Sequence, residues 1–259
     1  MSADFPQNGP PPPGYQPPGY PPGYPPPRPP GLDIGKAFSW AWQKFRANTA
    51  TLMLGAFVIL VIGIAVYVGA LVIAHSVTGG SMFLHSDPDT GLPTDFGSYL
   101  ANLGVVYAIL FVASVPLSVL TAGYSRAGLR IADGEKPTFG SIFSLRDAPR
   151  IMLTSVTLSL GILVGLVLCY LPGLALGLFS SFTLLFVLDH GQKPVDAIKS
   201  SFALVKTNFG PALGVTLLAG LVGGAGVLVC LVGALVSMPV AMLVHVYAYR
   251  FFSGGTIAP

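Results

Sequence analysis

Charged residues are scarce in this chain, since Asp, Glu, Lys and Arg make up 9% of its 259 residues while 53% are hydrophobic. Soluble domains carry about a quarter of their residues as charges, so the composition excludes an ordinary soluble fold and predicts an integral membrane protein. The net charge of +3 is too small for a nucleic-acid-binding surface. Two cysteines, Cys169 and Cys230, are too few for a disulfide-dense scaffold or a Cys-rich zinc site.

Catalytic motifs are also lacking. None of the four histidines accompanies a nucleophile elbow, and neither a phosphate-cradling GxxxxGK[ST] nor a zinc-binding HExxH pattern occurs. The apolar runs contain no Asp/His pair of the kind that an intramembrane protease or a proton pump needs. We therefore expect a non-enzymatic protein with no catalytic residues, cofactor or metal ion, with a lipid-handling enzyme as the alternative.

The amino-terminal segment, residues 1–31, lacks aliphatic clusters and consists largely of Pro, Gly, Tyr and Gln. Such a segment cannot offset its ordering entropy by burial, so we predict a disordered, polyproline-like tail. A secretory signal is not expected, because no apolar stretch follows the start of the chain. Pro-Pro-Gly-Tyr occurs three times, ending at Tyr15, Tyr20 and Tyr24. These tyrosines are candidate partner-binding residues.

Two modes of partner binding follow from this repeat. Pro-Pro-Gly-Tyr fits the PPxY form that aromatic grooves of WW-type modules recognise. The other mode is a flexible multivalent arm whose weak contacts add through effective concentration, and it is favoured if the chain is bacterial, because WW-type modules are not expected there.

Apolar runs in residues 32–252 predict an all-α membrane bundle, followed by a short tail at 253–259. Runs of this length can each cross a hydrocarbon core of about 30 Å. Two of them are too long for one crossing, so we divide them at Leu171–Gly173 and near 233–237, just before Pro239. The predicted spans are residues 50–74, 99–123, 151–170, 173–189, 209–233 and 236–252. Amphipathic spacing predicts interfacial helices at about 33–46, 138–146 and 194–206.

Charge gives the predicted topology. With the tail in the cytoplasm, all 13 Lys and Arg fall on the inner side of a six-span layout. The loop at 75–97 would lie outside, and it carries Asp87, Asp89 and Asp95 but no basic residue. Both termini are therefore expected to be cytoplasmic.

A short internal repeat accompanies this layout. Trp42, Phe45 and Asn48 have the same spacing as Phe202, Val205 and Asn208, and each triplet directly precedes a span. Phe139 and Phe143 fit the equivalent place more loosely, without an Asn. Three units, each an interfacial helix followed by a transmembrane hairpin, are the hypothesis; chance similarity among amphipathic helices is the alternative.

Residues 193–213, KPVDAIKSSFALVKTNFGPAL, carry a family resemblance. This stretch resembles the interfacial-helix segment of bacterial six-span membrane proteins that are similar to the membrane domain accompanying some glycerophosphodiester phosphodiesterases. The Pro-Gly-Tyr tail joined to such a domain resembles the proline-rich multi-pass membrane proteins of actinobacteria. The resemblance covers residues 32–252 and implies a bacterial plasma-membrane location. It carries over no catalytic residue, because the soluble phosphodiesterase domain has no counterpart here.

Several polar residues have a functional and a structural interpretation. His245, near Arg250 on the last span, is a candidate polar group at the inner mouth, or a hydrogen-bonded histidine in an aromatic belt. The loop from His85 to Gly91 is a weak cation-ligand set or simply a solvated acidic loop. Cys169 and Cys230 either form a disulfide near the outer ends of their spans or pack as small apolar residues.

Glycines recur at GxxxG spacing, which lets helix backbones approach closely in a membrane. Their number suggests a compact bundle. The candidate helix-packing pairs are Gly161/Gly165, Gly173/Gly177, Gly210/Gly214 and Gly220/Gly224.

The expected function is that of a scaffold, assembly factor or accessory subunit acting through its cytoplasmic tail. Its expected partners are membrane lipids and, through residues 1–31, other membrane or cytoplasmic proteins, but not nucleic acid. A transporter or channel for a small or amphipathic solute is the alternative. Against that alternative, the predicted spans lack the ionisable groups that coupled transporters place near the bilayer midplane.

Overall fold

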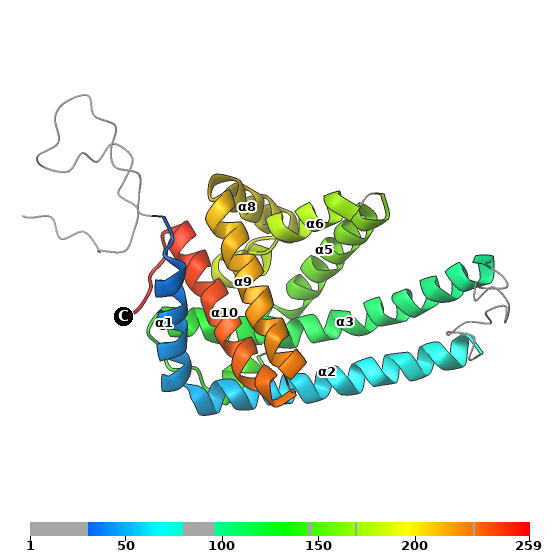
Figure 1. The fold of residues 1–259 in the computed structure, drawn as a ribbon, viewed down its shortest axis with the longest axis horizontal. Coiled ribbons are helices and arrows are strands. Elements are labelled where there is room, and N and C mark those ends of the chain that lie inside the picture. Colours follow the sequence, from blue (N-terminus) through cyan, green and yellow to red (C-terminus); the bar gives the residue numbers. More distant parts are fainter. Residues whose placement is uncertain (1–30, 80–95, 145–146, 169, 230) are drawn as a thin grey trace, which may run out of the picture.

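The computed structural model describes residues 31–79, 96–144, 147–168, 170–229 and 231–259. Within these ranges the chain forms ten helices and no strand (Figure 1). The helices are α1 (Ile34–Ala47), α2 (Thr49–Val77), α3 (Phe96–Ala132), α4 (Phe139–Ile142), α5 (Ala148–Leu168), α6 (Tyr170–Phe179), α7 (Thr183–His190), α8 (Pro194–Thr207), α9 (Phe209–Val229) and α10 (Leu231–Ser253). The tail carrying Tyr15, Tyr20 and Tyr24 lies outside the described residues, as do Cys169, Cys230 and the loop from His85 to Gly91.

Within the described residues, six helical segments are long and apolar enough to cross a membrane. They are α2, α3, α5, the pair α6 and α7 counted as one, α9 and α10. The all-α fold with six apolar spans is thereby confirmed.

Both helix breaks near prolines lie elsewhere than the sequence predicts. α6 begins at Tyr170, so Pro172 occupies the first helical turn, where its missing N–H would have no intrahelical partner anyway. α10 begins at Leu231 and continues through Pro239. The break between α9, which ends at Val229, and α10 therefore precedes the predicted break at 233–237. Proline is tolerated inside a membrane helix when neighbouring groups satisfy the freed backbone.

Two further elements differ from the prediction. α4 covers only Phe139–Ile142 of the predicted interfacial helix at 138–146. Asp147 beyond it has a positive φ of 64°, a conformation that cannot continue a right-handed helix. The predicted span at 173–189 is interrupted by a turn at 180–182, between α6 and α7.

The α6–α7 turn is held by Ser201 of α8. The Ser201 hydroxyl donates to the carbonyl of Phe179 over 2.7 Å and accepts from the N–H of Phe182 over 3.2 Å. Both backbone groups lose their helical partners at the turn, and leaving them unpaired in a buried site would cost free energy. One hydroxyl therefore satisfies both sides of the interruption.

The predicted repeat is visible in two of the three units. Asn48 follows α1 and Asn208 follows α8, and they have similar backbone angles (φ −127°, ψ 24° and φ −120°, ψ 35°). Each side-chain amide donates over 3.0 Å to the carbonyl four residues earlier, that of Lys44 or Leu204. The same residue thus makes the same bend between an interfacial helix and its span.

The units are linked head to tail into a closed ring. The first unit is α1 to α3, the second α4 to α7 and the third α8 to α10. Each interfacial helix packs on the second span of the preceding unit: α4 on α3, α8 on α6 and α7, and α1 on α10. At one of these contacts the backbone of Ile142 in α4 lies so close to Gly123 in α3 that no Cβ would fit.

The hydrophobic core lies in this ring, which we call the base: α1, α4, α7, α8 and the carboxyl-terminal parts of α3 and α10. Its buried members include Trp40, Phe45, Phe182 and Tyr249. Away from the base the hairpins diverge, and α2 with α3 extends as a separate arm (Figure 1). In an apolar stretch of 18 residues, only 11% of α2 or of α3 is buried, against 44% of the corresponding stretch in α10. The suggestion of a compact bundle therefore holds for the base and not for the arms.

Candidate functional site at the centre of the base

Three helix ends converge at the centre of the base. α3, α7 and α10 are the second spans of the three units, and each is followed by a glycine with positive φ: Gly134 (85°), Gly191 (61°) and Gly254 (71°). Glycine adopts this conformation without the penalty that a Cβ imposes, which makes it the usual residue just past a helix end. Because α3, α7 and α10 end close together, the charged residues at their carboxyl-terminal ends lie at one place.

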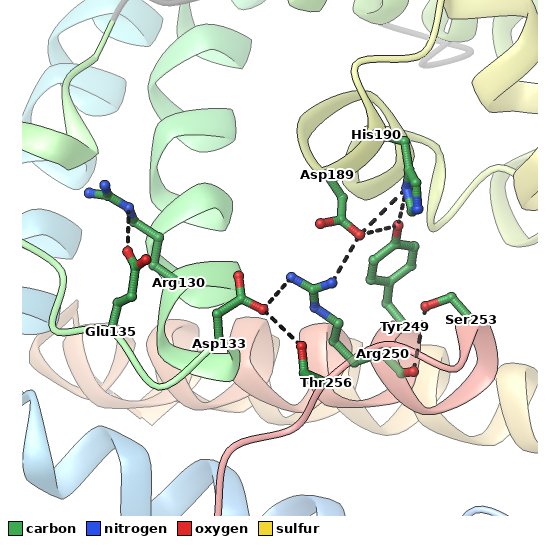
Figure 2. Close-up of polar contacts among 9 residues, drawn as sticks. All are labelled: Arg130, Asp133, Glu135, Asp189, His190, Tyr249, Arg250, Ser253 and Thr256. Atoms are coloured by element: carbon green, nitrogen blue, oxygen red, sulfur yellow. Dashed lines mark hydrogen bonds and ion pairs between the residues drawn. The ribbon is translucent and has the colours of Figure 1, made fainter. Parts of the chain in front are cut away.

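Arg250 of α10 forms ion pairs with carboxylates from both other units (Figure 2). Its Nη2 lies 2.7 Å from Oδ1 of Asp133, just after α3, and its Nη1 lies 3.1 Å from Oδ2 of Asp189 in α7. The Arg250 side chain is 9% exposed, that of Asp189 16% and that of Asp133 39%. One guanidinium therefore joins all three units at a largely buried point.

Hydrogen bonds extend the cluster on both sides. The Tyr249 hydroxyl donates to Oδ2 of Asp189 over 2.9 Å, and His190 Nδ1 lies 3.1 Å from the same hydroxyl oxygen. With that donor direction fixed, His190 is the donor of the second bond. On the other side, the Thr256 hydroxyl donates to Asp133 over 3.4 Å. Figure 2 shows the chain of contacts running from His190 to Thr256 through Arg250.

The carboxyl-terminal segment after α10 covers this cluster. Gly255 lies against the Arg250 side chain, since a Cβ there would be 2.7 Å from Cδ of Arg250. Further on, the N–H of Ala258 donates to the carbonyl of Ala132 over 2.8 Å, and Trp40 Nε1 donates to the carbonyl of Ala258 over 2.8 Å. The segment thereby ties α3 and α1 to the end of α10.

A polar cavity of about 730 Å³ adjoins the cluster. Asp133 and Asp189 of the cluster line it, and the rest of its polar lining includes Arg126, Arg130, Arg150, Asp147, Thr138 and Ser141. Asp147 forms ion pairs with two arginines, Arg126 at 3.4 Å and Arg150 at 3.6 Å. Arg130 pairs with Glu135 at 3.2 Å in an exposed contact. In the part of the chain that the structure describes, no group of three or more His, Cys, Asp or Glu side chains could hold a metal ion.

His245 lies at the α6–α7 turn. Its Nε2 is 3.1 Å from the carbonyl of Ser181, and its ring stacks on Phe182 with 4.4 Å between centroids. The histidine therefore satisfies a third backbone group of the interrupted span. It does not line the polar cavity described above.

The candidate packing glycines have different surroundings. A Cβ on Gly165 would lie 2.9 Å from Cα of Gly173, so the backbones of α5 and α6 touch there. A Cβ on Gly214 would meet Ile34 at 3.5 Å, an ordinary contact. Among the described residues, a Cβ on any of Gly161, Gly177, Gly210, Gly220 or Gly224 would meet nothing within 4 Å. Between α9 and α10, the backbones of Gly226 and Gly233 approach closely, a pair that the GxxxG spacing does not include.

The central residues of the site, Asp133, Asp189 and Arg250, were not among the residues that the sequence analysis selects. A signal for their convergence exists in the sequence: Gly-Glu-Lys-Pro at 134–137 and Gly-Gln-Lys-Pro at 191–194 mark equivalent turns after two second spans. Such a repeat locates the turns, but the pairing of charges across units depends on the closure of the ring.

Comparison with known proteins places the chain among mycobacterial relatives. It is 34% identical to uncharacterized protein Rv2560 of Mycobacterium tuberculosis (strain ATCC 25618 / H37Rv), over 96% of this chain and 75% of the relative. Uncharacterized protein Mb2590 of Mycobacterium bovis is also 34% identical, and uncharacterized protein MT2637 of M. tuberculosis strain CDC 1551 is 33% identical, with the same coverage. The chain belongs to this family. No family model matches it. No solved structure matches it either.

Proposed function

We propose that this protein is a non-enzymatic multi-pass membrane protein that acts as a scaffold, assembly factor or accessory subunit. The Arg250 cluster carries the proposal. In this cluster one guanidinium pairs with two carboxylates from the other units. The charged groups therefore bind one another within the protein and hold the three hairpins in a fixed arrangement. A fixed base that supports three diverging arms suits a protein whose task is to hold others.

The distribution of polar groups also supports this function over transport. The charged members of the described spans cluster at the base, whereas α2 is free of Asp, Glu, Lys and Arg along its whole length. Coupled transporters place ionisable groups near the midplane, on the solute pathway. The polar cavity beside Asp133 and Asp189 is the feature that favours the competing function, a transporter or channel for a small or amphipathic solute.

The proposed location is the plasma membrane of a bacterium, with both termini and the base in the cytoplasm. The positive-inside rule supports it, since all 13 Lys and Arg fall on one side. The end of the chain lies beside the middle of α1, joined to it by the Trp40–Ala258 hydrogen bond (Figure 1). Residues 1–31 then extend into the cytoplasm, where Tyr15, Tyr20 and Tyr24 are the proposed partner contacts.

Affinity purification from native membrane tests the scaffold. The full chain is compared with a variant lacking residues 1–31, and with a full-length variant in which Tyr15, Tyr20 and Tyr24 are replaced by Ala. Specific partners that are lost with both variants support docking through the tyrosines. Identical partner lists for all three proteins would contradict it. Solute uptake by liposomes containing the full chain would favour the transporter instead.

Topology is tested separately by cysteine labelling in a Cys-free background. Ser86→Cys should react with an impermeant reagent from outside, and Ser200→Cys only after the membrane is opened. The reverse pattern would overturn the proposed orientation.

A further inference from the structure

Two hollows of different character meet at Arg150, at the start of α5. One is the polar cavity beside the Arg250 cluster. The other is a groove of about 620 Å³ between α5 and the first turn of α8, lined by Pro149, Leu153, Thr157 and Val195 as well as by charged residues. Arg150 lines both. A polar hollow next to an apolar groove, with Arg150 lining both, suits an amphipathic molecule.

The groove runs along the membrane-spanning helix. From Arg150 to Thr157 it follows two turns of α5, roughly 10 Å at the helical rise of about 1.5 Å per residue. Leu153 and Val195 are exposed along it, by 57% and 56%. An alkyl chain could therefore lie against these side chains while its head group stays at the level of Arg150.

The entrance of the groove favours an anionic head group. Arg150 and Lys193 line it with one carboxylate, Asp196, and the other carboxylate near Arg150, Asp147 at 3.6 Å, is shared with Arg126. Lys193 is also the N-cap residue of α8, and its side chain makes no capping hydrogen bond. Pro194 has no N–H and the N–H of Ala197 bonds to the carbonyl of Lys193, so the first-turn donors that can face an anion are those of Val195 and Asp196. Arg150 in turn passes close to Gly191, where a Cβ would lie 3.4 Å from its Nη1. The glycine leaves room for the guanidinium between the two hollows.

We infer that this groove is a binding site for one anionic glycerophospholipid. The phosphate lies between Arg150 and Lys193, because guanidinium and ammonium groups form charge-assisted hydrogen bonds to phosphate oxygens. One acyl chain lies along Leu153, Thr157 and Val195. The site goes beyond the proposed scaffold function and does not involve residues 1–31.

Native mass spectrometry of the detergent-purified full chain tests the site, with phosphatidylglycerol or phosphatidylcholine as the added lipid. The variants are Arg150→Gln and Lys193→Gln. Lys199→Gln is the matched control, because it removes the same charge from the exposed surface of the same helix, away from the groove. We expect a single phosphatidylglycerol adduct whose affinity falls roughly tenfold in each groove variant, as for one lost charge-assisted hydrogen bond. Lys199→Gln should bind like the unaltered chain.

Three results would overturn the inference: equal binding by all variants, equal binding of phosphatidylcholine, or displacement of the lipid by soluble glycerophosphoglycerol at comparable concentration. The last would identify a site for free phosphate compounds instead of a lipid. Because Lys193 is exposed, its variant tests the site even if Arg150→Gln fails to fold. The variant lacking residues 1–31 should keep the adduct, so failure of the scaffold proposal is distinguishable from failure of this one.

Discussion

The guanidinium of Arg250 lies 2.7 Å from the carboxylate of Asp133, although 117 residues separate them in the chain. Together with the contact to Asp189, this ion pair joins the last span to the first two units. The base is therefore held by a charge that comes from the third unit and two opposing charges that come from the others.

Replacement of Arg250 by Met should strongly destabilise the protein, because it leaves the largely buried Asp189 and the partly buried Asp133 without a counter-charge. Breaking one side of a buried pair typically costs about 3–5 kcal/mol. Chemical unfolding in detergent measures the loss. Arg130→Met is the control, since the Arg130–Glu135 pair is exposed and should be worth about 1 kcal/mol or less. Equal losses for the two variants would contradict a central role for Arg250.

The two carboxylates should differ in importance. Asp189→Asn should lower the free energy of unfolding more than Asp133→Asn, because Asp189 is 16% exposed against 39%. Asp189 also accepts the Tyr249 hydroxyl over 2.9 Å, whereas Asp133 accepts the Thr256 hydroxyl only over 3.4 Å. We expect a difference of about 1 kcal/mol, the size of one hydrogen bond. The same unfolding measurement ranks them, and the opposite order would refute the assignment of Asp189 as the more deeply held partner.

Ser201→Ala should loosen the turn between α6 and α7. The change leaves the N–H of Phe182 and the carbonyl of Phe179 without their partner, at a cost of about 1–3 kcal/mol. Protection of the Phe182 amide from hydrogen exchange should fall with it. The neighbouring Ser200→Ala is the matched control, with an expected effect within about 0.5 kcal/mol. A Ser201 variant as protected as the control would mean that other groups hold the turn.

Gly165 and Gly161 belong to one GxxxG pair but should tolerate alanine differently. At Gly165 the new Cβ would meet the backbone of Gly173 at 2.9 Å, so α5 and α6 must separate, at about 1–3 kcal/mol. At Gly161 the Cβ meets nothing within 4 Å among the described residues, and stability should stay the same or rise slightly. Equal destabilisation by both substitutions would show that Gly161 packs against another molecule in the membrane.

The sequence was most informative where one property repeats along the chain. Continuous apolar runs are sufficient to predict six spans, because every backbone polar group in a bilayer must be paired within a helix. The interfacial helices before Asn48 and Asn208 were also predictable, since their amphipathic spacing and the shared Asn are local features. Local features predict local structure.

The positions of helix breaks were harder to predict from the sequence. Proline ends a helix only when no neighbouring group satisfies the backbone carbonyl that it leaves without a partner. Pro239 lies within α10, whereas the α6–α7 turn contains no proline at all. That turn exists because Ser201 and His245, from two other helices, satisfy its backbone groups. No pattern within residues 173–189 contains this information.

The sequence by itself therefore determined an all-α membrane protein with six apolar spans, because hydropathy and helical spacing act within a single segment. Only the tertiary structure decided that three helix ends meet, that Arg250 faces Asp133 and Asp189, and that Arg150 lies between a polar cavity and an apolar groove. Those contacts depend on the closure of the ring of interfacial helices, which brings together residues that no single segment of the chain contains.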